Sequence, residues 1–141
     1  MASVLKVDEM QGVTSAGDIT ITGEGGSGTM QLQQGVAKVW VNFDGTQTSI
    51  TARDSFNVSA MVDDSASGEY QIQFTSNFSN NDYAPSGFVG STGNSSGWVG
   101  GPNSQGDSDY GTGQLQISTF YQNAGEAEFV YVMTTIHGDL A

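Results

Sequence analysis

The sequence has no cysteine, only three basic residues and only two prolines among its 141 residues. Without cysteine, neither a disulfide framework nor a thiolate metal site can hold the fold together. No apolar run approaches the roughly 20 residues that a membrane-spanning helix needs, and the first residues lack the apolar segment of a secretory signal peptide. We therefore expect one domain, with at most a small appendage, that does not insert into a membrane and is stabilised by its hydrophobic core.

Positive charge is the scarcest feature of the chain. Lys6, Lys38 and Arg53 stand against 15 acidic residues, the formal net charge is −12, and no Lys or Arg follows Arg53. Proteins that bind nucleic acid neutralise phosphates with Lys and Arg, and anionic membrane surfaces attract proteins through the same residues. The sequence therefore predicts no nucleic-acid partner and no membrane partner. An acidic surface of this kind keeps a protein in solution by self-repulsion, or attracts a cation or a basic partner.

Short runs of alternating apolar and polar residues dominate the rest of the sequence. They are rich in Val, Ile, Thr, Phe and Tyr, and turn clusters containing Gly, Asp, Asn and Ser separate them. No stretch shows the i, i+3, i+4, i+7 apolar stripe of an amphipathic helix over two or more turns. The pattern predicts an all-β fold, an antiparallel β-sandwich or jelly-roll-like domain with a short N-terminal β extension. The clearest candidate strands are residues 36–43, 55–62, 69–74, 114–120 and 128–136.

Two Gly-rich stretches suggest the organisation of the chain. We interpret residues 1–28 as an N-terminal attachment segment that ends in a flexible Gly-rich junction, and residues 29–141 as the β-sandwich domain. Within that domain, residues 90–113 form a long loop of Gly, Ser and Asn. Loops of this length are usually functional or disordered.

The first Gly-rich stretch also matches a nucleotide-binding motif. Gly23, Gly25 and Gly28 follow an alternating run with the spacing G-x-G-x-x-G, the dinucleotide-binding fingerprint. That motif requires a strand that turns directly into a helix, whose N-terminus holds the pyrophosphate. Here Gly35 ends the next segment after about two turns, and no alternating strand–helix pattern follows. We therefore interpret the glycines as a turn and expect no cofactor.

A second motif resembles that of a hydrolase. Residues 93–97 read G-x-S-x-G around Ser95, and Asp107 or Asp109 and then His137 follow in the order of α/β-hydrolases. The motif needs a strained strand-to-helix turn, which this polar stretch does not offer, so a hydrolase remains a remote alternative. Asp107 and Asp109 also resemble part of a calcium loop whose later ligands are missing. We expect no enzyme and no metal site, and we interpret His137 as a strand-terminal surface or interface residue.

The long loop is the candidate binding surface. It contains two aromatic residues among amides, hydroxyls and carboxylates, a composition typical of saccharide stacking and of adaptable binding surfaces. The candidate contacts to a receptor or glycan are Trp98, Asn103, Asp107, Asp109 and Tyr110. The alternative is that the two aromatic rings anchor the loop itself.

The last candidate strand suggests self-association. Residues 128–136 are apolar on both faces, so one thin sheet cannot bury all of their surface. We predict an oligomer interface that includes Phe129, Tyr131 and Met133.

The central block resembles tail-fibre-like virion structural proteins of marine bacteriophages. The shared runs are residues 38–45, 53–59, 68–75 and 81–84, with Asp54 at a variable place, and residues 4–25 show a weaker likeness. The resemblance implies a fibre or spike module, a homo-oligomer and most often a trimer, that projects from the particle and contacts the host surface or a glycan on it. It also implies a virion location after synthesis in the host cytoplasm. Attachment to other virion proteins through residues 1–22 is the matching expectation, and a capsid decoration protein, a head fibre or cement protein, is the alternative.

Overall fold

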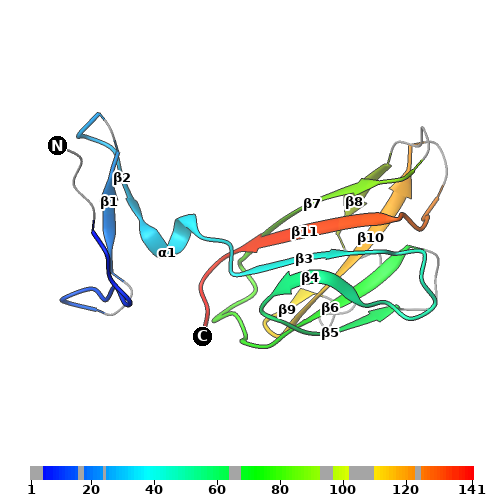
Figure 1. Ribbon diagram of the computed structural model, residues 1–141, viewed down its shortest axis with the longest axis horizontal. Coiled ribbons are helices and arrows are strands. Elements are labelled where there is room, and N and C mark those ends of the chain that lie inside the picture. The colour runs from blue at the N-terminus through cyan, green and yellow to red at the C-terminus, as the bar shows by residue number, and fades with distance from the viewer. Residues whose placement is uncertain are drawn as a thin grey trace. The chain divides into compact units, whose positions relative to one another are not determined.

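The computed structural model describes residues 5–15, 18–23, 25–63, 68–92, 97–101, 110–122 and 125–141. The chain divides into two compact units, Met1–Val36 and Ala37–Ala141. Within the described residues, the first unit has a small two-stranded sheet and the second has two larger sheets (Figure 1). The expected all-β fold is confirmed.

The first unit is built around one β-hairpin. β1 (Thr20–Thr22) pairs antiparallel with β2 (Thr29–Gln31), and a single helical turn, α1 (Leu32–Gly35), follows. Ile21 lies opposite Met30, so both side chains share one face of the hairpin, and the neighbouring pairs on the other face are Thr and Gln. None of the described residues of this unit is buried.

The Gly-rich stretch is the turn of this hairpin. The Gly23 N–H donates to the Gly28 carbonyl at 2.8 Å, and the Gly26 N–H donates to the Gly23 carbonyl at 2.9 Å. Gly26 has a φ of 70°, which glycine adopts without steric cost. The interpretation of these glycines as a turn is confirmed. Their interpretation as a junction between domains is wrong, because β2 pairs back onto β1 and the first unit continues to Val36.

The second unit is a β-sandwich of two antiparallel sheets, which Figure 1 shows as two layers. The β3 sheet has the order β4-β3-β11-β7 and consists of β3 (Val39–Phe43), β4 (Ala52–Phe56), β7 (Ala84–Gly90) and β11 (Tyr131–His137). The β10 sheet has the order β5-β6-β10-β8, with β9 also paired to β10. Its strands are β5 (Val58–Asp63), β6 (Glu69–Phe74), β8 (Gly97–Gly100), β9 (Tyr110–Gly111) and β10 (Gln114–Tyr121).

The core lies between the two sheets, where alternate residues of each strand point inward. Phe43 of β3 and Tyr70 of β6 meet edge to face, with ring centroids 4.9 Å apart. The Tyr70 hydroxyl donates to the Gly45 carbonyl at 3.0 Å. A Cβ atom at position 45 would lie 2.3 Å from that hydroxyl oxygen, so this close approach requires glycine. The buried apolar residues of the strands include Val39, Val41, Phe43, Tyr70, Ile72, Phe74, Leu115, Ile117, Val132 and Ile136.

A single residue carries the chain from one sheet to the other. Asn57 stands between β4 and β5 with a φ of 59°, in the left-handed region that asparagine tolerates better than most residues. Its side chain accepts a hydrogen bond from the Ser76 N–H at 2.7 Å and donates one to the Ser76 carbonyl at 3.0 Å. These two bonds hold the corner, and with it the placement of β5 at the edge of the β10 sheet.

Candidate functional site

Trp98 lies on the outward face of β8, against a second aromatic ring. In the register between β8 and β10, Trp98 is opposite Phe120, and the two rings stack with centroids 5.8 Å apart and planes at 20°. Trp98 is 47% exposed, whereas Phe120 is half-buried. Phe120 thus supports an indole that stays accessible to solvent. An exposed and supported indole is suited to stacking on a planar or weakly polar ligand surface, such as the face of a sugar ring.

Amide side chains occupy the same outward face further along the sheet. In the register between β6 and β10, Gln73 is opposite Gln114 and Gln71 is opposite Gln116. The Gln73 Nε2 donates to the Gln71 Oε1 at 2.9 Å, so these two amides hold each other in place. Gln116 is 1% exposed, whereas Gln71 and Gln73 are half-buried and remain reachable. Carboxamides both donate and accept hydrogen bonds, which suits them to ligands rich in hydroxyl groups.

Tyr110 lies on the inward face of the β10 sheet, the face opposite to Trp98. It pairs with Leu115, which is buried in the core. Its ring stacks on that of Tyr83 with centroids 4.6 Å apart, and its hydroxyl donates to the Tyr83 carbonyl. Burial, and to a lesser degree the charge of Asp82, raise the pKa of Tyr110. Tyr110 is half-buried and does not share a face with Trp98, and its contacts with Tyr83 favour the alternative that this ring anchors its own segment.

The other predicted contacts of the long loop lie outside the described residues. These are Asn103, Asp107 and Asp109, and Ser95 of the hydrolase-like motif also lies there. His137 is the last residue of β11, where it is half-buried and pairs with Ala84. Among the residues that the structure describes, no three His, Cys, Asp or Glu side chains form a group that could hold a metal ion. In the same part of the chain, no helix is long and apolar enough to cross a membrane.

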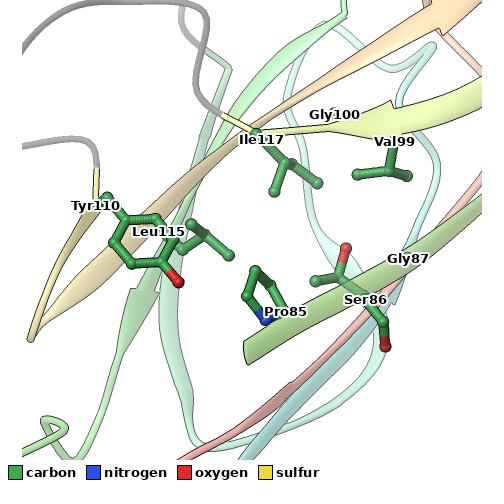
Figure 2. Close-up of a pocket in the computed structure, with 10 residues that line it drawn as sticks. Pro85, Ser86, Gly87, Val99, Gly100, Tyr110, Leu115 and Ile117 are labelled. Carbon is green, nitrogen blue, oxygen red and sulfur yellow. The ribbon is translucent and has the colours of Figure 1, made fainter. Parts of the chain in front are cut away.

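A small cavity opens where the edges of the two sheets meet (Figure 2). Its volume is about 120 Å³, below the roughly 300 Å³ at which pockets begin to accommodate small-molecule ligands. A Cβ atom at Gly87 would lie 3.1 Å from Val99 Cγ2, so the two edges are already in close contact here. We interpret this cavity as a packing gap rather than a binding site. Its lining includes Pro85, Ser86 and Gly87 of β7, Val99 and Gly100 of β8, Tyr110, and Leu115 and Ile117 of β10.

Phe129 is not available to a partner. It is 0% exposed, and its ring packs against Tyr121 with centroids 4.8 Å apart. β11 begins only at Tyr131, so the alternation of inward and outward side chains does not extend back to Phe129. The predicted interface role of Phe129 is therefore wrong. Tyr131 and Met133 are 43% and 38% exposed on the outward face of β11.

Other aromatic residues surround this pair on the outward face of the β3 sheet. Phe88 of β7 is opposite Met133, and Phe56 of β4 is opposite Trp40 of β3. Phe88 is 74% exposed and Phe56 is 52% exposed. The alternation in residues 36–43 is consistent with an outward Trp40, but the exposure of Phe56 and Phe88 depends on strand pairing that the sequence does not show.

Arg53 occupies the border of this face. Its guanidinium lies over the Tyr131 ring at 4.8 Å from the centroid, forms an ion pair with Asp44 at 3.1 Å, and donates to the Phe43 carbonyl at 2.9 Å. Hydrogen bonds from Thr46, and then the charge of Arg53, lower the pKa of Asp44. The arrangement fixes Tyr131 at one end of the aromatic face and leaves the Arg53 charge neutralised.

Comparison of the chain with family models, with curated proteins and with solved structures gives no match. The two outward faces are therefore the candidate functional surfaces of the described residues. The β10 sheet presents an aromatic pair with amides, and the β3 sheet presents a largely apolar surface. Both arrangements suit binding through stacking and burial of apolar area.

Proposed function

We propose that the protein is a structural module of a bacteriophage virion, a fibre or spike domain that projects from the particle and binds a glycan of the host surface. The observation that supports the glycan site most directly is the 47% exposed indole of Trp98 stacked on Phe120. Gln71 and Gln73 offer hydrogen-bonding groups on the same face. The resemblance of residues 38–84 to tail-fibre-like proteins supports the virion role.

A site of this kind is weak when it acts alone. Stacking of a sugar on one aromatic pair contributes on the order of 1 kcal/mol beyond the area that it buries. Firm attachment therefore depends on several copies held on one particle, because each bound copy raises the effective concentration of the next. A homo-oligomer, as the resemblance implies, supplies such copies. The chemistry required is binding without turnover, so the proposal is a non-enzymatic module.

We propose the first unit as the segment that attaches the module to other virion proteins. None of its described residues is buried, and an isolated two-stranded hairpin is marginally stable in water. Ile21 and Met30 form an apolar pair on one face, at 40% and 54% exposure. A partner surface that covers this face would stabilise the hairpin. We therefore extend the attachment segment expected in residues 1–22 through β2 to Val36, because β1 pairs with β2 and both belong to the first unit.

Adsorption of particles to host cells tests the glycan site. Particles that contain Trp98→Ala should adsorb several-fold more slowly than wild-type particles, with normal assembly. Val62→Ala is the matched control, because Val62 is 41% exposed on the outward face of β5, in the same sheet. Equal adsorption of wild-type and Trp98→Ala particles would reject the glycan site and favour the capsid decoration alternative, in which no host contact is needed.

A further inference from the structure

Three neighbouring strands of the β3 sheet contain no carboxylate, no Lys and no Arg, and they contain one histidine, His137 at the end of β11. β3, β11 and β7 contain no Asp, Glu, Lys or Arg, in a chain whose formal net charge is −12. At their border, β4 adds Arg53, whose charge Asp44 neutralises, and the carboxylate of Asp54. Repulsion between acidic copies opposes self-association wherever carboxylates meet. This face is a broad surface on which two copies can meet without that repulsion.

The same face has both a hollow and a projecting ring. A hollow of about 320 Å³ lies between Trp40 on one side and Met133 and Phe88 on the other. Ser86 and Thr135 lie between these walls, and their hydroxyl oxygens are 2.9 Å apart and hydrogen-bonded to each other. The walls of the hollow are thus largely apolar, and the hydroxyls of Ser86 and Thr135 satisfy each other. The lining also includes Asn42 and Thr134. Phe88, at its rim, is 74% exposed.

We propose that this face, defined by Trp40, Phe88 and Met133, binds a second copy of the chain, with Phe88 of one copy seated in the hollow of the next. A face with a projecting ring and a hollow can pair with the same face of a second copy about a two-fold axis. In a ring of three, each projecting ring would instead enter the hollow of the next copy. Trp, Tyr, Phe, Met and Arg are the residue types that interface cores favour, and Trp40, Phe88, Tyr131, Met133 and Arg53 supply them. This inference rests on the homo-oligomer of the proposed function and names the face that forms it, and its test in solution does not depend on a virion role.

The mass of the purified full chain in solution, measured over a range of concentrations by light scattering and sedimentation, tests the proposal. The wild-type chain should associate into two or three copies, and Phe88→Asp should weaken that association at least about tenfold. Phe88→Ser, which removes the ring without adding charge, should weaken it in the same direction. Val62→Asp is the matched control, an exposed apolar residue of the other sheet, and should associate like the wild type.

Several outcomes would overturn the proposal. A wild-type chain that stays monomeric at high micromolar concentration would exclude this contact. A Phe88→Asp chain that associates as strongly as the wild type would show that the interface lies elsewhere. Because the proposed interface is apolar and the chains are acidic, added salt should preserve or strengthen the association. Association that disappears as salt rises would show an ionic contact and would also contradict the proposal. Circular dichroism of both Phe88 variants should match the wild type, since Phe88 is 74% exposed.

Discussion

Trp98 and Tyr110 lie on opposite faces of the β10 sheet, although both belong to the same polar stretch of sequence. Trp98 pairs with Phe120 and points outward, whereas Tyr110 pairs with Leu115 and points inward. Phe120 and Leu115 are five positions apart on one strand, so their side chains point to opposite sides. The two aromatic residues therefore lie in separate environments, Trp98 on the solvent-exposed face and Tyr110 toward the interior.

Because Tyr110 and Trp98 lie in different environments, their replacement by Ala should cause unequal losses of stability. Tyr110→Ala removes the stacking on Tyr83 and the hydrogen bond to its carbonyl, and should lower the free energy of unfolding by about 3 kcal/mol. Trp98→Ala removes a half-exposed ring and should cost about 1 kcal/mol. Urea denaturation followed by circular dichroism measures both values. Equal losses would show that Trp98 is also an internal anchor.

Replacement of Phe129 and of Met133 by Ala should likewise cause unequal losses of stability. Phe129→Ala opens a cavity in the core and should lower the free energy of unfolding by about 3–5 kcal/mol. This loss should be the same at every protein concentration, because the ring contacts Tyr121 of its own chain. Met133→Ala should leave the folded monomer nearly unchanged and affect mainly self-association. A Phe129→Ala chain that is as stable as the wild type but self-associates less would show that Phe129 belongs to the oligomer interface.

The raised pKa of Tyr70 predicts that the folded protein loses stability in alkaline solution. Burial raises the pKa of Tyr70 from 10.0 to about 12 in the folded protein. Between these pH values the unfolded chain releases the phenolic proton and the folded chain retains it, so rising pH favours unfolding. Below about pH 10, Tyr70 should therefore not make the free energy of unfolding depend on pH. From about pH 10 to 12, the free energy of unfolding should fall. Burial raises the pKa of Tyr83 in the same direction.

Tyr70→Phe separates this effect from general alkaline damage. The variant should lose about 1 kcal/mol near neutral pH, because the hydrogen bond to the Gly45 carbonyl is gone. Its stability should then fall less steeply than that of the wild type as the pH rises above 10. Urea denaturation at a series of pH values, together with the ultraviolet absorbance of tyrosinate, measures this difference. Identical slopes for the two chains would contradict the raised pKa.

The sequence predicts the inward residues of several core strands because their alternation is local, but the strand expected at residues 55–62 is divided at Asn57 between two sheets. In residues 69–74, Tyr70, Ile72 and Phe74 alternate with polar side chains, and the structure buries these three. A period of two is enough to assign each residue to one of two faces. It does not show where a strand begins: the apolar run includes Phe129, whereas β11 starts two residues later, at Tyr131.

Strand pairing is the part that the sequence does not show. Pairing between strands that are far apart in the chain places Phe120 against Trp98. The same pairing places Gln71 on the face that Trp98 occupies. The register of these contacts depends on packing across the whole sandwich. The short strand β2 was missed for a related reason, since three residues form too brief a pattern to predict and only its pairing with β1 defines it.

The central claim, that the chain is a projecting component of a virion, is tested most directly by its position on intact particles. Phage particles purified from infected cells that contain the chain would be labelled with an antibody against the folded Ala37–Ala141 unit and imaged by electron microscopy. The account predicts label on fibres or spikes that project from the particle, in several copies per structure. Label spread over the capsid shell would favour a decoration protein instead. Particles that lack the protein, while infected cells contain it, would contradict the account.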